Sequence, residues 1–334
     1  MKLATYRDGS RDGQLVVVSR DLSQAHFAAG IASRLQSALD DWNFLAPQLE
    51  ELSTSLNHGR ARHAFAYEPQ RCLAPLPRAY QWADASAYPS HLARLRQARG
   101  AGKQADAPVP LVMYQGGSDD LLGPCEDACF GSPEDGIDFE AEIAAITGDV
   151  AQGASPQQAL EGVRLLMLAN DWTLRNLVPE ELAKGFGLIQ SKPSTSFSPV
   201  AVTPDELGLD WSGGRVHLAI QSSVNGQRSG EPDAGAEMHF HFGELIAHLA
   251  HSRRVRAGSI VGAGAVSNAD RSRGFSCLAE QRADDVLAGG AAQTGYLRFG
   301  DVVQIEMRGR DGVSLFGAIR QRVSDVADTE VPVA

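Results

Sequence analysis

The sequence predicts an α+β fold that is mainly β: a large mixed domain over residues 76–334 preceded by a small N-terminal domain over residues 1–75. Three observations support this. The length of 334 residues suits one large domain with a smaller companion. Short alternating segments end at glycine-containing turns. Strands and helices do not alternate regularly, which argues against a doubly wound parallel sheet.

The N-terminal unit is predicted from a turn, a strand and a helical stretch. Asp12-Gly13 is a hairpin turn, and the apolar run Leu15–Val18 follows it as a strand. Apolar residues over 31–52 recur at helical spacing. Pro75 and Pro77 oppose both helix and sheet, so we place the domain boundary there.

In the large domain, two segments alternate between apolar and polar residues and lead into turns. Residues 216–220 run toward Asn225-Gly226, and residues 303–307 run toward Asp311-Gly312. Both are expected to be hairpin strands.

Two helices are expected in the same domain. The first begins at Pro156, with Ser155 and Gln158 forming a capping box, and continues through residues at helical spacing to Met167. The second places Phe242, Leu245, Ile246 and Leu249 on one buried face.

Composition and charge exclude several functional classes. The formal net charge of -11 opposes nucleic acid or an anionic membrane as the main partner. No stretch of about 18 apolar residues suggests a membrane span, and the N-terminal residues lack a signal-peptide core, so the expected location is cytoplasmic. Four cysteines without a Cys-x-x-Cys spacing are expected to be free thiols, at the following positions: Cys72, Cys125, Cys129 and Cys277.

Acidic residues provide the first candidates for chemistry. Within residues 136–146 the apolar side chains alternate, so Glu140 and Glu142 share one face of a predicted strand, about 7 Å apart. Alone, this pair is typical of a solvated strand face; both could also reach one cation. Asp171 ends an apolar run, where it is either a solvated residue at a helix end or a carboxylate with a partner of opposite charge. Asp84 and His91 could supply a ligand and a general base.

Together and in this order, these elements resemble the fumarylacetoacetate hydrolase family. The matching features are an aspartate seven residues before a histidine, a Glu-x-Glu pair and an Asn-Asp-Trp segment. The segments around Tyr114 and Lys192, the glycine-rich residues 262–268, and Glu280 also match. The resemblance covers residues 84–280 and implies that family's mixed β-sandwich roll for the large domain.

The resemblance also implies a metal centre and a catalytic set. Asp84, Glu140, Glu142 and Asp171 would hold a divalent cation, and their oxygen donors suit Mg²⁺, Ca²⁺ or Mn²⁺. The implied catalytic residues are His91 as general base, Glu280 as its orienting partner, and Lys192; the implied substrate contacts are Tyr114, Lys192 and Ser196. One arginine among Arg94, Arg96 and Arg99 would balance the oxyanion.

The expected activity is hydrolysis of a carbon-carbon bond in a small anionic diketo acid by a homodimer. Fumarylacetoacetate, cleaved to fumarate and acetoacetate in tyrosine breakdown, is the first expectation, with other acylpyruvates next. Alternatives are a decarboxylase, hydratase or isomerase of keto-enol dicarboxylates, or a non-enzymatic metal-binding protein. Residues 177–182, where relatives place polar substrate contacts, and Ala265 depart from the family pattern, which leaves the substrate open.

Overall fold

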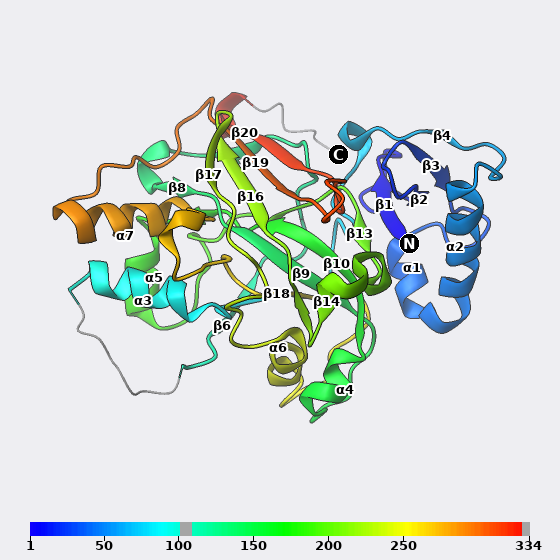
Figure 1. The fold of residues 1–334 in the computed structure, drawn as a ribbon, viewed down its shortest axis with the longest axis horizontal. Coiled ribbons are helices and arrows are strands. Elements are labelled where there is room, and N and C mark those ends of the chain that lie inside the picture. The colour runs from blue at the N-terminus through cyan, green and yellow to red at the C-terminus, as the bar shows by residue number, and fades with distance from the viewer. Residues whose placement is uncertain (101–108, 329–334) are drawn as a thin grey trace.

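The computed structural model describes residues 1–100 and 109–328. Two β-sheets pack face to face at the centre, and helices cover the outer surfaces (Figure 1). The predicted mainly β architecture, with a smaller N-terminal unit beside a large β domain, is confirmed.

The sheets are mixed. The large sheet contains, in spatial order, β4 (Phe65–Ala66), β3 (Gln24–Phe27), β2 (Gln14–Val18), β1 (Lys2–Tyr6), β13 (Ala201–Val202), β10 (Val163–Asn170), β9 (Ala141–Thr147), β18 (Ile260–Gly262), β5 (Trp82–Ala85) and β6 (Met113–Gly116), with β12 (Ser196–Phe197) paired to β10. The second sheet contains β17 (Gln227–Gly230), β16 (Ile220–Val224), β19 (Val302–Met307), β20 (Ile319–Asp325) and β7 (Ala128–Phe130). Two short pairs join β8 (Ile137–Asp138) to β11 (Thr173–Leu174) and β14 (Trp211–Ser212) to β15 (Arg215–Val216).

The α-helices lie in three groups around these sheets (Figure 1). They are α1 (Leu35–Asp40) and α2 (Trp42–Asn57) beside β1–β3, α4 (Pro156–Leu160) and α6 (Phe242–Leu249) packed together, and α3 (Pro89–Ala98), α5 (Val178–Lys184) and α7 (Leu278–Gly289) at the opposite end from α2. Short 3-10 helices span Pro69–Arg71, Pro133–Asp135, Pro204–Asp210, Arg271–Arg273 and Val326–Asp328.

The central strand β10 is apolar from Leu165 to Ala169 because both of its faces are buried there. Leu166 and Leu168 face the second sheet's core, whereas Leu165 and Met167 pack toward α1 and α2. This corrects the helix predicted from Pro156 to Met167: the capping box at Ser155 forms, but α4 ends at Leu160. A continuous apolar run suits a doubly buried strand, and its residues also happened to fit helical spacing.

Other predicted elements have mixed outcomes. The strand over 15–18, the strand over 303–307 and the helix over 242–249 are confirmed as β2, β19 and α6. The strand expected over 216–220 is wrong in extent, because β15 ends at Val216 and β16 begins only at Ile220. The Asn225-Gly226 turn then joins β16 to β17, and Asn225 takes the left-handed conformation with φ 52°.

The N-terminal unit is continuous with the large sheet. β1 pairs antiparallel with β13, placing Lys2 opposite Val202, and β2, β3 and β4 extend the sheet outward. Backbone hydrogen bonds thus join the two parts, and the division of the chain into two domains near residue 75 stays a prediction.

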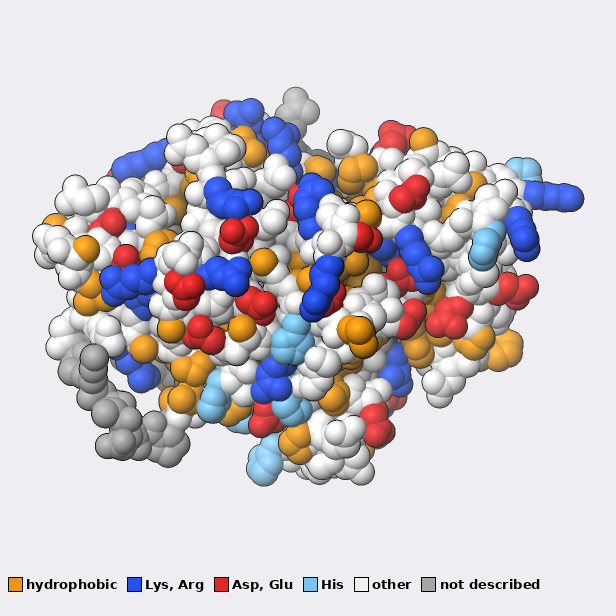
Figure 2. All heavy atoms as spheres, in the orientation of Figure 1, with side chains coloured by type: hydrophobic (Ala, Val, Ile, Leu, Met, Phe, Trp, Pro, Cys, Tyr) orange, Lys and Arg blue, Asp and Glu red, His pale blue; other side chains and the backbone are white. Residues whose placement is uncertain are grey.

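Charges of both signs are mixed over the surface. Figure 2 shows lysine and arginine interspersed with aspartate and glutamate on the face drawn, without a broad patch of one sign. Among the described helices, none has the length and apolar character needed to cross a membrane.

Candidate active site

Strand register brings three acidic residues to one face of the large sheet. Asp84 on β5 lies opposite Gly262 on β18, which in turn lies opposite Ala144 on β9. Because alternate residues share a face, Glu142 points the same way as Ala144. Glu142 lies opposite Ala169 on β10, and Asp171 follows two residues later.

The three carboxylates form a compact buried cluster. One oxygen from each of Asp84, Glu142 and Asp171 lies within 4.8 Å of the others. Asp84 Oδ1 accepts a hydrogen bond from the Gly264 backbone at 3.0 Å. A Cβ at Gly262 would lie 2.3 Å from the same oxygen, so only glycine fits there. The predicted glycine-rich segment thus makes room for Asp84.

Glu142 shows that this cluster fits a cation. Both of its carboxylate oxygens are completely buried and accept no hydrogen bond. Burial, and then the neighbouring carboxylates, raise the pKa of Glu142 and of Asp84 well above the ordinary range. Buried like charges without a counter-charge are strongly unfavourable, and a hard divalent cation with oxygen ligands removes that penalty. These three residues would hold the ion.

The raised pKa values predict an inverted pH dependence for the cation-free protein. Above about pH 4.5 the folded chain retains protons on these carboxyls that the unfolded chain releases, so stability falls as pH rises. In a chelator, the free energy of unfolding in urea should therefore be higher at pH 5.5 than at pH 8. Glu142→Gln should show a smaller slope; an equal slope in both proteins would contradict this assignment.

Glu140, the fourth predicted ligand, lies outside the cluster. The predicted continuous strand is interrupted: β8 ends at Asp138 and β9 begins at Ala141, so the two glutamates do not share one regular strand face. Glu140 Oε1 accepts from Arg175 at 2.6 Å and Oε2 from Lys192 at 2.7 Å. Burial alone would raise the pKa of Glu140, but these two cations outweigh it and hold it below the ordinary range.

Lys192 connects Glu140 to the acidic cluster. Its buried ammonium donates to Glu140 Oε2, to Asp171 Oδ2 at 2.6 Å and to Thr173 Oγ1 at 2.7 Å. Burial would lower the pKa of Lys192, but Asp171 and Glu140 raise it above the ordinary value, so the side chain stays protonated. Lys192 is thus a buried lysine held by ion pairs and not a solvated surface residue.

His91 and Glu280 form a base with a fixed orientation. His91 on α3 and Glu280 in the first turn of α7 are joined by Nδ1 and Oε1 at 2.9 Å. Arg94, one helical turn from His91, donates to the other oxygen of Glu280 at 2.8 Å. Burial would raise the pKa of Glu280, yet the His91 hydrogen bond and Arg94 bring it below the ordinary value. An ionised Glu280 keeps the proton on Nδ1, so Nε2 is the basic nitrogen.

Of the predicted substrate contacts, Tyr114 and Lys192 line the cavity and Ser196 does not. Tyr114 on β6 lines the cavity and donates to Asp171 Oδ2 at 2.6 Å. Ser196 does not reach the cavity: it is completely buried and accepts a hydrogen bond from Trp172 Nε1 at 2.9 Å. Its expected substrate contact is thus replaced by a structural role under the Asn-Asp-Trp segment.

A cavity of about 430 Å³ opens over the acidic cluster. Polar and charged residues line its floor, including Asp84, His91 and Lys192. Its walls are mostly apolar and come from the following residues: Leu92, Leu95, Val112, Met113, Val178, Leu182 and Leu188. The size and the mixture of apolar walls with few polar groups suit a small organic molecule.

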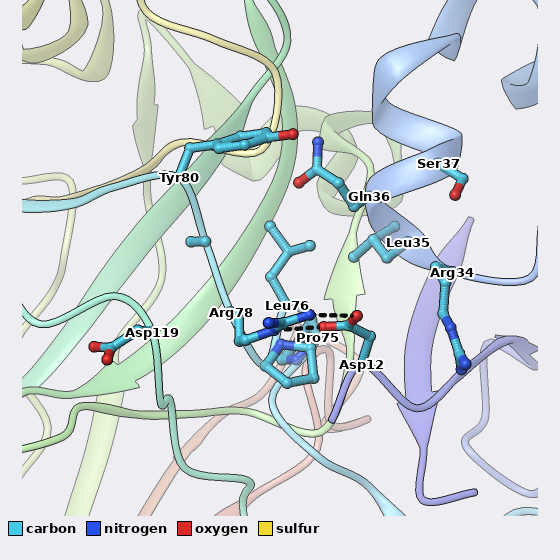
Figure 3. Close-up of a pocket in the computed structure, with 12 residues that line it drawn as sticks. Asp12, Arg34, Leu35, Gln36, Ser37, Pro75, Leu76, Arg78, Tyr80 and Asp119 are labelled. Atoms are coloured by element: carbon cyan, nitrogen blue, oxygen red, sulfur yellow. Dashed lines mark hydrogen bonds and ion pairs between the residues drawn. The ribbon is translucent and has the colours of Figure 1, made fainter. Parts of the chain in front are cut away.

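A larger cavity of about 540 Å³ lies elsewhere, beside α1 (Figure 3). The bidentate ion pair between Arg78 and Asp12 is part of its lining, with donor–acceptor distances of 2.8 and 2.7 Å (Figure 3). The lining contains none of the residues of the acidic cluster, and these two charges are already paired with each other. The chemistry therefore belongs to the cavity over Asp84.

Two important residues were missed from the sequence. Arg175 lines the cavity and joins Asp138 to Glu140, with its Nε donating to Asp138 at 2.8 Å. Asp138 also accepts from the backbones of Leu278 and Ala279 at the start of α7. The sequence does place Arg175 four residues after Asp171, and Asp138 two residues before Glu140. Neither spacing indicates that the side chain is buried in the site.

Comparisons with known proteins match both parts of the chain. Residues 81–324 match the model described as fumarylacetoacetate (FAA) hydrolase C-terminal, and residues 1–78 match fumarylacetoacetase N-terminal domain 2. The 2,4-didehydro-3-deoxy-L-rhamnonate hydrolase of Sphingomonas sp. is 25% identical over 227 residues, covering 66% of this chain and 68% of that protein. An uncharacterized Pyrococcus horikoshii protein is 23% identical over 161 residues, covering 48% and 68%.

Solved structures share the fold. Maleylpyruvate hydrolase from Sphingobium sp., in complex with manganese(II) and pyruvate, has a TM-score of 0.66 at 15% identity, covering 97% of this chain and 99% of that chain. Fumarylacetoacetate hydrolase from Exiguobacterium antarcticum has 0.63 at 17%, covering 97% and 99%. A 2-hydroxyhepta-2,4-diene-1,7-dioate isomerase from Mycobacterium marinum has 0.60 at 14%, covering 98% and 100%. The chain belongs to the fumarylacetoacetate hydrolase family, whose members are enzymes that act as hydrolases or isomerases.

Proposed function

We propose that this enzyme is a divalent-cation-dependent hydrolase that cleaves a carbon-carbon bond in a small 1,3-diketo acid. Fumarylacetoacetate, giving fumarate and acetoacetate, is the first substrate to test, and acylpyruvates are the alternative. One observation carries the hydrolytic assignment: His91, whose Nδ1 lies 2.9 Å from Oε1 of Glu280, lines the same cavity as Asp84 of the acidic cluster.

His91 would activate water. Its Nε2 takes a proton from a water molecule, and the resulting hydroxyl adds to the carbonyl carbon of the acyl group. The carbon-carbon bond to the methylene then breaks, its electron pair moves onto the departing carbon, and a proton returns there from Nε2. Glu280 supports the imidazolium formed in between, and Arg94 keeps Glu280 ionised.

The remaining residues position charge. A bound cation would supply the positive charge that stabilises the enolate developing on the two carbonyl oxygens. Lys192 holds Glu140 and Asp171 in place and keeps a fixed positive charge beside the acidic cluster. Tyr114 fixes Asp171 from the cavity side. By donor type, the proposed cation is Mg²⁺, Ca²⁺ or Mn²⁺.

The direct test follows enol absorbance during incubation with fumarylacetoacetate, acetylpyruvate and oxaloacetate, with Mg²⁺ or Mn²⁺ and then with a chelator. Cleavage of one of the first two, loss of turnover on chelation, and a fall of about 10²–10⁴-fold in kcat for His91→Asn are expected. The exposed His251→Asn variant is the matched control.

Two results would reject the hydrolase. Turnover that survives chelation or His91→Asn removes the proposed mechanism. Oxaloacetate decarboxylation or enol isomerisation without cleavage of the diketo acids would assign the second candidate, which uses the acidic cluster without a hydrolytic water.

A role in tyrosine breakdown, a cytoplasmic location and a homodimeric assembly belong to the same proposal. The division at residue 75 belongs to it too. Support comes from the resemblance of the catalytic segments and, for the two-part organisation, from separate family matches to residues 1–78 and 81–324.

A further inference from the structure

A second cavity adjoins the one over the acidic cluster. It has a volume of about 220 Å³ and lies between α3 and α7, which pack against each other at the end of the molecule far from α2 (Figure 1). Leu95, Arg99, Arg175 and Val178 line both cavities. The two spaces therefore share a wall, and a ligand held over the cluster can extend along it.

The chemistry of this second cavity differs from that of the first. Small and apolar side chains form much of it, including Ala98, Ala283 and Val286. No aspartate or glutamate lines it, whereas Arg99 and Arg282 do. An apolar channel bordered by cations suits a hydrocarbon segment that ends in an anion.

The two arginines are available to a ligand. Within residues 1–100 and 109–328, neither Arg99 nor Arg282 lies within 4.0 Å of a carboxylate oxygen. Arg282 is instead held in place: its Nη1 donates to the Thr294 carbonyl, and its guanidinium lies 4.1 Å from the centre of the Tyr296 ring. The nearby Asp285 is engaged by the backbones of Gln293 and Thr294.

Among the described residues, Arg282 therefore presents a fixed positive charge that no carboxylate contacts within 4.0 Å. By contrast, Arg94, Arg175 and Lys192, which are other cations of this region, are each paired with a carboxylate. A ligand carboxylate entering between α3 and α7 would meet Arg282 and Arg99 without first breaking an ion pair of the part of the chain that the structure describes.

We propose that this cavity is an accessory acyl subsite, which takes the far end of a diketo acid whose acyl chain has an apolar middle and a terminal carboxylate. The proposal rests on the proposed function for the identity of the reacting end. The subsite would make the enzyme prefer substrates with a long acyl chain and a terminal charge, through contacts remote from the bond that breaks.

The test compares adipoylpyruvate with hexanoylpyruvate, which have acyl chains of equal length with and without the terminal carboxylate. The wild-type enzyme should favour adipoylpyruvate by about tenfold in kcat/KM and in Kd measured by calorimetry, as expected for one charge-assisted hydrogen bond. Arg282→Gln, alone or with Arg99→Gln, should abolish this ratio. Arg96 is an exposed arginine of α3, the helix that ends just before Arg99, and Arg96→Gln should keep the ratio.

A second variant tests the space rather than the charge. Ala283→Leu fills the subsite and should lower kcat/KM for both long substrates at least about tenfold relative to acetylpyruvate, whereas the exposed Ala288→Leu on the same helix should not. Equal Kd values in the wild type for the two substrates with six-carbon acyl chains, or a ratio that survives the double arginine variant, would overturn the subsite. Absence of any cleavage with the Kd ratio intact would instead reject the proposed hydrolase alone.

Discussion

Replacing Glu142 with glutamine is expected to remove cation binding while making the cation-free protein more stable. The substitution keeps the size of the side chain but eliminates a buried carboxylate that has no hydrogen-bond partner. The free energy of unfolding in chelator at pH 8 should rise by about 1–3 kcal/mol, because glutamine carries no acidic proton that the folded state must retain while the unfolded chain releases it. Affinity for Mn²⁺ should fall at least about 100-fold, with a matching loss of kcat/KM.

Thermal unfolding with and without Mn²⁺ measures both effects at once. The cation should raise the melting temperature of the wild-type protein and leave Glu142→Gln almost unchanged. Glu306→Gln is a suitable control, because Glu306 is also buried but pairs with Arg308 on the other sheet. A variant that is destabilised in chelator, or that still responds to Mn²⁺ at the wild-type concentration, would show that Glu142 is not a ligand.

Replacing Lys192 with methionine should have the opposite effect on stability. Lys192 is buried between Glu140 and Asp171, so its loss leaves two carboxylates without their shared cation. Breaking such a pair costs about 3–5 kcal/mol. The expected fall in kcat is about 10²–10³-fold, because a buried positive charge that lines the cavity is also lost.

Urea unfolding and steady-state kinetics would measure these changes for Lys192→Met. Lys184→Met on α5 is the control, since Lys184 pairs with Glu180 on the exposed surface and its loss should alter stability by less than about 1 kcal/mol. A stable Lys192→Met protein with ordinary turnover would remove this residue from the mechanism.

The sequence predicted the candidate site better than it predicted the strands that build it. Asp84, Asp171 and His91 were found by spacing and resemblance. The structure places Asp84 and His91 on one cavity, and Asp171 lies next to Asp84 and accepts a hydrogen bond from Tyr114 of the cavity lining. Glu140 and Glu142 were expected to act alike, because alternation assumes a regular strand. The break between β8 and β9 separates them, and it depends on pairings with β11 and the start of α7 that local sequence does not specify.

The helix predicted to reach Met167 failed for a related reason. Periodicity shows which residues are apolar, but it does not show whether one face or both faces of an element will be covered. In β10 both faces are covered, one by the second sheet and the other by helices from the N-terminal unit. Ser196 was misplaced because burial under Trp172 cannot be read from a serine-rich segment.

The pairing of β1 with β13 has a consequence for synthesis on the ribosome. The outer edge of β1 cannot pair until Val202 has been synthesised, because Val202, the partner of Lys2, lies 200 residues further along the chain. At roughly 5–20 residues per second, that edge remains uncovered for about 10–40 seconds. Its neighbour β2 is the apolar run Leu15–Val18, so the nascent chain displays a hydrophobic hairpin with an open edge throughout this interval. Slow elongation through the first two hundred residues should therefore favour aggregation, and a chaperone that binds short apolar segments should counteract it.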